Sequence, residues 1–130
     1  PDAQNMNHVR QRGAKMLVYH GVSDPIFSID DTITWYRGID RSSGQRADEF
    51  ARLYPVPGMG HCSGGPATDQ FDALTPLIDW VENGNGPERI VASGNSFPGR
   101  TRPLCRYPSF PRYRGSGDVN SASSFVCASS

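Results

Sequence analysis

The chain has 130 residues, which is the size of one domain or of part of one. Its 13 Lys and Arg balance its 13 Asp and Glu, so net charge gives no reason to expect an anionic partner such as nucleic acid. No apolar run approaches the roughly 18 residues that a membrane-spanning helix needs, so we expect no membrane partner either.

The first part of the chain predicts a helix followed by a strand. Residues 1–13 are polar with weak periodicity and indicate a short exposed helix that ends at Gly13. The apolar run Ala14–Gly21 is short enough for a strand, and its continuous apolarity predicts burial on both faces, as in a parallel sheet. Pro25 disfavours helical geometry at Asp24, so we expect Asp24 just past the end of this strand.

A helix, a second strand and a second helix follow. The segment SIDDTITWYRGIDR has a helical stripe of apolar residues, with Ser28 or Asp30 as the expected cap. Phe50–Val56 predicts a second short strand, which leads directly into the loop VPGMGHCSGG, residues 56–65. The segment DQFDALTPLIDWVENGNGP predicts an amphipathic helix that ends at Gly84. The expected apolar side of this helix consists of Phe71, Leu74, Leu77, Ile78, Trp80 and Val81.

This alternation of strands and helices predicts an α/β fold. Catalytic groups in such sheets lie beyond the carboxyl ends of the strands, and Asp24 and His61 are both expected there. Two strands do not form a stable parallel sheet alone, so we interpret the chain as the carboxyl-terminal part of a larger domain. Residues 93–130 are rich in Pro, Gly, Ser and Arg and predict an irregular tail.

The three cysteines match no zinc-binding spacing. Cys105 and Cys127 bracket a segment that cannot fold on apolar burial alone, and a disulfide between them would contribute roughly 3 kcal/mol. Cys62 then remains either as a reactive thiol or as half of a bridge to a residue outside the chain. Disulfides imply an oxidising compartment, so we expect a secreted or periplasmic protein.

Asp24 and His61 have the chain order of the last two members of an α/β-hydrolase triad, in which Ser comes first, then Asp or Glu, then His. In such a triad the acid orients the imidazole, and the histidine accepts and returns the serine proton. Each residue also has a simpler structural interpretation. Asp24 would cap the backbone before Pro25, and His61 would be an ordinary residue of a glycine-rich loop.

The nucleophile is not evident in the chain. Ser63 lacks the leading glycine of a G-x-S-x-G elbow and follows the Asp, which is the wrong order, so we expect the serine outside these residues. Cys62 beside His61 is an alternative nucleophile, although neighbouring loop residues seldom reach hydrogen-bond geometry. His20 is an alternative base, but its place at the end of a strand favours a structural role.

Several segments follow one another along the chain: KMLVYHGVSDPIFSIDDTITWY, VPGMGHCSGG, FDALTPLIDWVENGNGPERIVAS and RTRPLCRYPSFPRYRGSGDVNSASSFVC. They contain an H-G-x-x-D-P loop, a P-G-M-G-H-C loop and an R-P-L-C…Y-x-G-S-G-D…F-V-C tail. In combination these motifs resemble the carboxyl-terminal part of the tannase and feruloyl esterase family. The resemblance covers nearly the whole chain from Ala14 onward.

The resemblance implies that residues 1–130 are a carboxyl-terminal fragment of one α/β-hydrolase domain of a secreted serine esterase. The family's acid falls on Asp24 and its general base on His61. The implied substrates are small-molecule or polysaccharide-linked esters of aromatic acids, of the hydroxycinnamic or gallic kind. The nucleophile half of the domain and the family's lid domain are absent from this sequence. We therefore expect the fragment alone to be inactive and its remaining hydrolase domain to be its partner.

The resemblance also accounts for the cysteines. In the family, the cysteine after the catalytic His pairs with a cysteine before the catalytic Ser, and Cys62 matches the first of these. Cys105 and Cys127 match the family's carboxyl-terminal bridge. No cofactor is expected in this region, while calcium would belong to the missing lid domain.

Two other functions stay open at this point. The Arg- and Tyr-rich segment RTRPLCRYPSFPRYRGSG would serve a non-catalytic secreted module as a recognition surface for a polysaccharide or an acidic polymer. Its simpler interpretation is a disulfide-held wrap over the hydrolase domain. The other alternative is a thiol-dependent hydrolase that uses Cys62.

Overall fold

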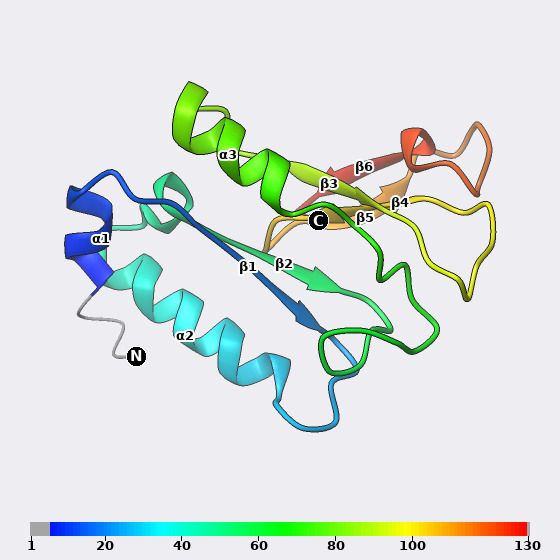
Figure 1. Ribbon diagram of the computed structural model, residues 1–130, viewed down its shortest axis with the longest axis horizontal. Coiled ribbons are helices and arrows are strands. Elements are labelled where there is room, and N and C mark those ends of the chain that lie inside the picture. The colour runs from blue at the N-terminus through cyan, green and yellow to red at the C-terminus, as the bar shows by residue number, and fades with distance from the viewer. Residues whose placement is uncertain (1–5, 130) are drawn as a thin grey trace.

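Two parallel strands form the part of the fold that positions the site. The computed structural model describes residues 6–129 of the chain (Figure 1). Strands β1 (Met16–Gly21) and β2 (Ala51–Val56) run parallel, from Met16 opposite Ala51 to Gly21 opposite Val56. Because this register keeps the strands level, their carboxyl ends lie together and the loops that follow them start side by side.

Helix α2 (Ile29–Ser42) connects the two strands and lies alongside them (Figure 1). A connection of this size is required because no tight turn can join parallel strands. Of the two expected caps, Ser28 is the one used, since its Oγ accepts a hydrogen bond from the Asp30 backbone N–H at 3.1 Å. Tyr36 is buried against β2, and its hydroxyl donates to the Ala51 carbonyl oxygen at 2.9 Å.

β1 is less buried than its apolar sequence predicts. Tyr19 is 44% exposed and most of the strand is half-buried, whereas the side chains of Leu53, Tyr54 and Val56 in β2 are fully buried. Within residues 6–129, β1 pairs with β2 alone. Its other edge therefore presents backbone N–H and C=O groups that have no strand partner.

Helix α3 (Leu74–Asn83) is shorter than the apolar pattern predicts. The Asp72 Oδ1 atom accepts hydrogen bonds from the backbone N–H groups of Leu74 and Thr75, both at 3.0 Å, and so starts the helix there. The end agrees with the prediction, because Gly84 takes the left-handed conformation with a φ of 74° and stops the helix.

The apolar side of α3 is only partly covered. Trp80 is buried, and the Arg52 guanidinium lies 4.9 Å from the centre of its ring. Leu74, Ile78 and Val81, which the sequence assigns to the same apolar side, are between 45% and 64% exposed. The helix thus has an apolar surface that the described residues leave open to solvent.

The segment after α3 is more regular than expected, which corrects the prediction of an irregular tail over 93–130. Two antiparallel pairs are present: β3 (Arg89–Ala92) with β4 (Arg102–Cys105), and β5 (Phe110–Tyr113) with β6 (Phe125–Ala128). The remaining elements are helix α1 (Asn7–Gln11) and the 3-10 turns η2 (Ala47–Glu49) and η3 (Ala122–Ser124). The tail strands have four residues each, and Pro103 and Pro111 interrupt their pattern, so the sequence shows no alternation there.

α1 lies within the segment predicted as a short helix. The first five residues of that segment lie outside the described part of the chain. Gly13 follows α1 with a φ of 72°, a conformation typical of a glycine just after a helix.

One covalent bond holds the tail together and one backbone hydrogen bond attaches it to the strand pair. A disulfide between Cys105 and Cys127 joins the end of β4 to β6 within the tail. The Tyr107 backbone N–H donates to the Leu53 carbonyl oxygen of β2 at 2.6 Å. The tail therefore packs against the second strand of the pair, and Figure 1 shows it on the side of the pair away from α2.

Candidate active site

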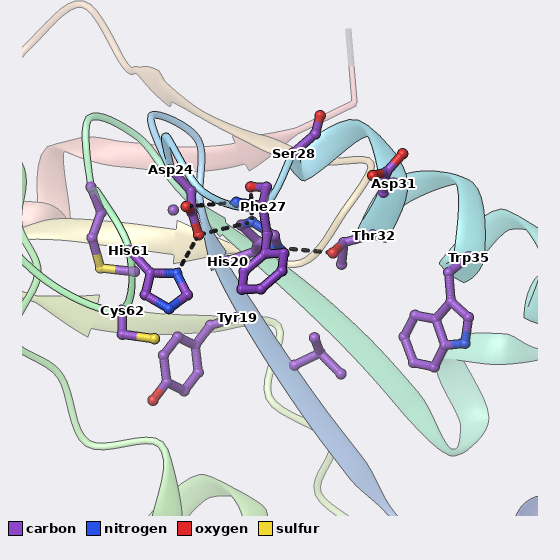
Figure 2. Close-up of a pocket in the computed structure, with 13 residues that line it drawn as sticks. Tyr19, His20, Asp24, Phe27, Ser28, Asp31, Thr32, Trp35, His61 and Cys62 are labelled. Carbon is purple, nitrogen blue, oxygen red and sulfur yellow. Dashed lines mark hydrogen bonds and ion pairs between the residues drawn. The ribbon is translucent and has the colours of Figure 1, made fainter. Parts of the chain in front are cut away.

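The loops after β1 and β2 bring Asp24 and His61 together, as the sequence predicts for residues beyond the ends of parallel strands. The His61 Nδ1 atom lies 2.9 Å from the Asp24 Oδ2 atom (Figure 2). An ionised carboxylate can only accept a hydrogen bond, so Nδ1 is the nitrogen that bears the proton. The Nε2 atom of His61 is then left with a lone pair that can accept a proton.

Asp24 is held at both carboxylate oxygens. Its Oδ1 atom accepts from the backbone N–H groups of Ile26 at 2.8 Å and Phe27 at 3.0 Å, while Oδ2 accepts from His61. The side chain is 4% exposed. Both interpretations of Asp24 therefore hold in geometry, because one oxygen caps the turn after Pro25 and the other pairs with the histidine.

These contacts keep Asp24 ionised. Burial favours the neutral acid, but the hydrogen bonds from His61, Phe27 and Ile26 outweigh it and lower the Asp24 pKa from 3.8 to about 2. A carboxylate that stays charged at neutral pH can orient the imidazole and stabilise it when it becomes positively charged.

The close approach of the two loops depends on glycine. A Cβ atom at Gly21 would lie 2.3 Å from the carbonyl oxygens of both Met59 and Gly60, which no side chain tolerates. Ser23 continues the contact, since its backbone N–H donates to the Met59 carbonyl oxygen at 3.0 Å. The glycine after His20 is therefore part of what places Asp24 next to His61.

The loop after β2 leaves His61 and Cys62 accessible. The His61 side chain is 41% exposed, and its ring lies 5.4 Å from that of Phe27. Cys62 is an exposed free thiol whose backbone is left-handed, with a φ of 64°, a conformation that is uncommon for a residue other than glycine. Ser63 is not among the residues that line the pocket beside the pair.

His20 lies closer to the site than a purely structural interpretation of it predicts. Its Nε2 atom is 3.4 Å from the same Asp24 oxygen that His61 contacts, and 3.0 Å from the Phe27 carbonyl oxygen. Its Nδ1 atom is 2.8 Å from the Thr32 Oγ1 atom of α2. The signal that could have found it is the H-G-x-x-D spacing, which puts His20 four residues before Asp24 at the end of the same strand.

A pocket of about 600 Å³ opens beside the pair, between β1, the start of α2 and the His61 loop (Figure 2). Its walls combine aromatic and aliphatic side chains with the polar groups of the pair. The lining residues are Val18, Tyr19, His20, Gly21, Asp24, Phe27, Ser28, Asp31, Thr32, Trp35, Met59, His61 and Cys62. Ser28 is the only serine among them, and its Oγ atom already caps α2. A pocket of this kind suits an apolar ligand with a polar group at one end.

Residues 6–129 contain neither a candidate metal site nor a candidate membrane span. No group of three or more His, Cys, Asp or Glu side chains there is arranged to hold a metal ion. No helix in the same range is long and apolar enough to cross a membrane.

A parallel strand pair with an Asp–His pair beyond its carboxyl ends is the arrangement that α/β-hydrolases use, and the fold places the chain in that class. The chain belongs to the tannase and feruloyl esterase family, whose model matches residues 3–128. The family resemblance that the sequence motifs indicate is thereby confirmed, and so is the predicted fold class.

Characterised relatives are much longer than this chain. A mono(2-hydroxyethyl) terephthalate hydrolase of Piscinibacter sakaiensis is 52% identical over 125 residues, which are 92% of this chain and 20% of that protein. Feruloyl esterase B of Aspergillus niger is 32% identical over 143 residues, with 95% of this chain and 27% of that protein covered. The chain thus spans between a fifth and about a quarter of the length of these relatives.

Solved structures share the fold. An esterase from Aspergillus oryzae superposes with a TM-score of 0.82 at 28% identity, over 96% of this chain and 29% of that one. Tannin acyl hydrolase from Aspergillus niger superposes with a TM-score of 0.72 at 26% identity, over 96% of this chain and 24% of that one.

Proposed function

We propose that this chain supplies the acid and the general base of a Ser-His-Asp triad in a carboxylic-ester hydrolase. The observation that supports this most is the 2.9 Å contact between His61 Nδ1 and Asp24 Oδ2 at the carboxyl ends of two parallel strands. Family membership supports the same class of reaction, since the relatives are named as esterases and hydrolases.

The proposed reaction runs through an acyl-enzyme. His61 Nε2 takes the proton of a serine hydroxyl as the serine oxygen forms a bond to the ester carbonyl carbon. The protonated imidazole then gives this proton to the leaving alcohol as the ester C–O bond breaks. Water attacks the acyl-enzyme by the same proton transfers, which release the acid and restore the serine. Asp24 stays ionised throughout and keeps the imidazole in the orientation that leaves Nε2 free.

We propose esters of aromatic acids as the substrate class. The relatives' names denote hydrolysis of feruloyl, terephthalate and tannin esters, which are all esters of aromatic acids. The pocket beside His61 supports this, because the rings of Tyr19, Phe27 and Trp35 line it. Flat aromatic groups pack well against such rings, edge to face or offset.

The serine is proposed to come from the rest of the hydrolase domain, outside these 130 residues. Three features support a missing neighbour: the unpaired edge of β1, the exposed apolar side of α3 and the length of the relatives. Among the described residues that line the pocket, the one serine hydroxyl already caps α2, so we propose that the chain is inactive alone.

Cys62 is proposed to be half of a disulfide that ties the base loop to the nucleophile loop. Its exposure and its place on the rim of the pocket support a partner outside the described residues. Peptide mapping of the unreduced full-length enzyme should find Cys62 in a bridge. A Cys62 that is alkylated without reduction, with loss of activity, would support the thiol-dependent alternative instead.

The disulfide between Cys105 and Cys127 supports the proposal of an oxidising compartment, and hence of a secreted or periplasmic protein. The calcium that the family resemblance implies would belong to the lid domain, so no step proposed here uses it.

The alternative of a recognition surface in the tail has less support. Arg106 contacts the Glu88 carboxylate at 2.6 Å and the Asp48 carboxylate at 3.2 Å. The Tyr107 hydroxyl accepts a hydrogen bond from Arg37 Nε at 2.8 Å. Arg106 and Tyr107 are thus engaged within the molecule, which favours the wrap over the domain for this part of the segment.

The triad assignment is tested in the full-length enzyme with a chromogenic aromatic ester. His61→Ala or Asp24→Asn should each lower kcat about 10³-fold or more. The first variant removes the group that carries the proton, and the second removes the carboxylate that orients it. His8→Ala is the matched control, since His8 is an exposed histidine away from the pocket. Near-normal turnover in either site variant would contradict the proposal.

A further inference from the structure

His20 is not a member of the Asp24–His61 pair, yet each of its ring nitrogens has a hydrogen-bonding partner. Its Nδ1 atom lies 2.8 Å from Thr32 Oγ1, and its Nε2 atom lies 3.0 Å from the Phe27 carbonyl oxygen. The same Nε2 atom lies 3.4 Å from Asp24 Oδ2. The His20 side chain is 12% exposed, so water has little access to compete for these hydrogen-bonding partners. Figure 2 shows His20 beside Asp24, with Thr32 on its far side.

The partners of Nε2 fix the tautomer of His20. A carbonyl oxygen and an ionised carboxylate both accept hydrogen bonds and cannot donate them. Nε2 must therefore bear a proton, which it donates to the Phe27 carbonyl oxygen, and the Asp24 Oδ2 atom lies 3.4 Å from the same nitrogen. The Thr32 hydroxyl can donate to an unprotonated Nδ1, and this contact from α2 keeps the ring in the orientation that directs Nε2 toward the carboxylate.

The His20 ring lies against the same carboxylate oxygen that His61 contacts. Asp24 Oδ2 faces His61 Nδ1 at 2.9 Å and His20 Nε2 at 3.4 Å, while Oδ1 is occupied by two backbone amides. A carboxylate held in this way has little freedom to rotate away from the base. His20 also donates a hydrogen bond to the Phe27 carbonyl oxygen, while the Phe27 backbone N–H donates to Asp24. Both backbone polar groups of Phe27 are therefore engaged by these two side chains, which stabilises the turn.

We propose that His20 is a positioning residue, which fixes the Asp24 carboxylate against His61 and is itself oriented by Thr32. This inference deepens the proposed function and rests on it for its kinetic consequence. His20 does not touch the reacting atoms, and its effect passes through Asp24. A misplacement of a catalytic group by about 1 Å costs on the order of 100-fold in rate, which bounds the expected effect.

The kinetic test uses the full-length enzyme and an aromatic ester. His20→Ala should lower kcat by about 10- to 100-fold and change KM much less than kcat, because the effect of His20 on the reaction passes through Asp24 although its ring also lines the pocket. His20→Gln should restore most of the loss, because the Gln side-chain amide can donate from about the position of Nε2. A merely structural role would not be rescued in this way. His8→Ala should match the wild type in both constants.

Unchanged kcat in His20→Ala would overturn the inference, and so would a loss in a folded Ala variant that Gln does not restore. A rise in KM without a fall in kcat would also overturn it. These results are separate from a failure of the proposed function, which would appear as turnover that survives His61→Ala.

A second readout needs no activity. In the ¹⁵N-histidine-labelled wild-type enzyme at neutral pH, NMR should find His20 protonated at Nε2. In Thr32→Val, which removes the hydroxyl but keeps the shape, the Nδ1 signal of His20 should shift. A His20 that is unprotonated at Nε2, or that does not respond to Thr32→Val, would overturn the inference even if the Ala variant does not fold.

Discussion

Asp24 is the residue on which two structural requirements meet. One carboxylate oxygen ends the turn after β1 by accepting two backbone N–H groups, and the other accepts a hydrogen bond from His61. The turn and the pair are therefore not separate explanations of this residue. A side chain that caps its own loop is also a side chain whose direction is fixed, which is what an orienting acid requires.

The lowered pKa of Asp24 predicts a dependence of stability on pH. Asp24 binds a proton less readily in the folded state than in the unfolded chain. The ionised carboxylate therefore makes its full contribution to the free energy of unfolding at pH values above its ordinary pKa of 3.8. This contribution is lost as the pH falls toward about 2. The urea midpoint of the wild-type enzyme should thus exceed that of Asp24→Asn at pH 6, and the gap should narrow between about pH 4 and pH 2. A gap that stays constant over this range would show that Asp24 has its ordinary pKa.

Between elements, the decisive feature is the level register of β1 and β2, which starts both site loops at one edge. The backbone of Gly21 then lies against Met59 and Gly60 at the base of the histidine loop. Neither strand holds a catalytic side chain, yet their pairing fixes how far apart the two loops begin. The geometry of the site is therefore set by backbone contacts before the Asp24 and His61 side chains meet.

Gly21→Ala should separate the two loops, because its Cβ would lie 2.3 Å from two carbonyl oxygens. We expect a fall of at least 10-fold in kcat together with a lower melting temperature. Gly44→Ala is a matched control, since Gly44 has a φ of 67° but open space around it. This control should cost stability of about 1 kcal/mol and leave kcat unchanged. Equal kinetic effects of the two variants would contradict the role assigned to Gly21.

The sequence predicts the elements that have a strong local signal. Asp24 and His61 could be placed beyond strand ends because Pro25 and the glycine-rich loop mark where each strand stops. The early part of the α3 prediction failed, because Asp72 caps the helix at Leu74 although the apolar pattern extends further back. The tail strands pair over long sequence distances, and no local pattern reveals such pairing. The place of His20 at the end of a strand favours a structural role, and its partners from α2 and from the turn are brought together only in the folded chain.

As a whole, the molecule has the free strand edge and the exposed apolar surface that are typical of one part of a larger domain. Its core lies around β2, while the free edge of β1 and the apolar side of α3 remain uncovered among residues 6–129. The proposed acid and base, Asp24 and His61, are already in contact on this chain, so the proposed serine would meet a preformed pair. Preformed geometry of this kind lowers the reorganisation that catalysis requires.

If Asp24 acts only through His61, the two residues form a unit and their effects are not additive. The most direct test of this claim is kcat/KM for an aromatic ester in the full-length enzyme, measured for Asp24→Asn, His61→Ala and the double variant. The account predicts that the double variant lies within about twofold of His61→Ala, because an acid without its base has nothing to orient. Losses that multiply in the double variant, or turnover near the wild-type rate in either single variant, would contradict it.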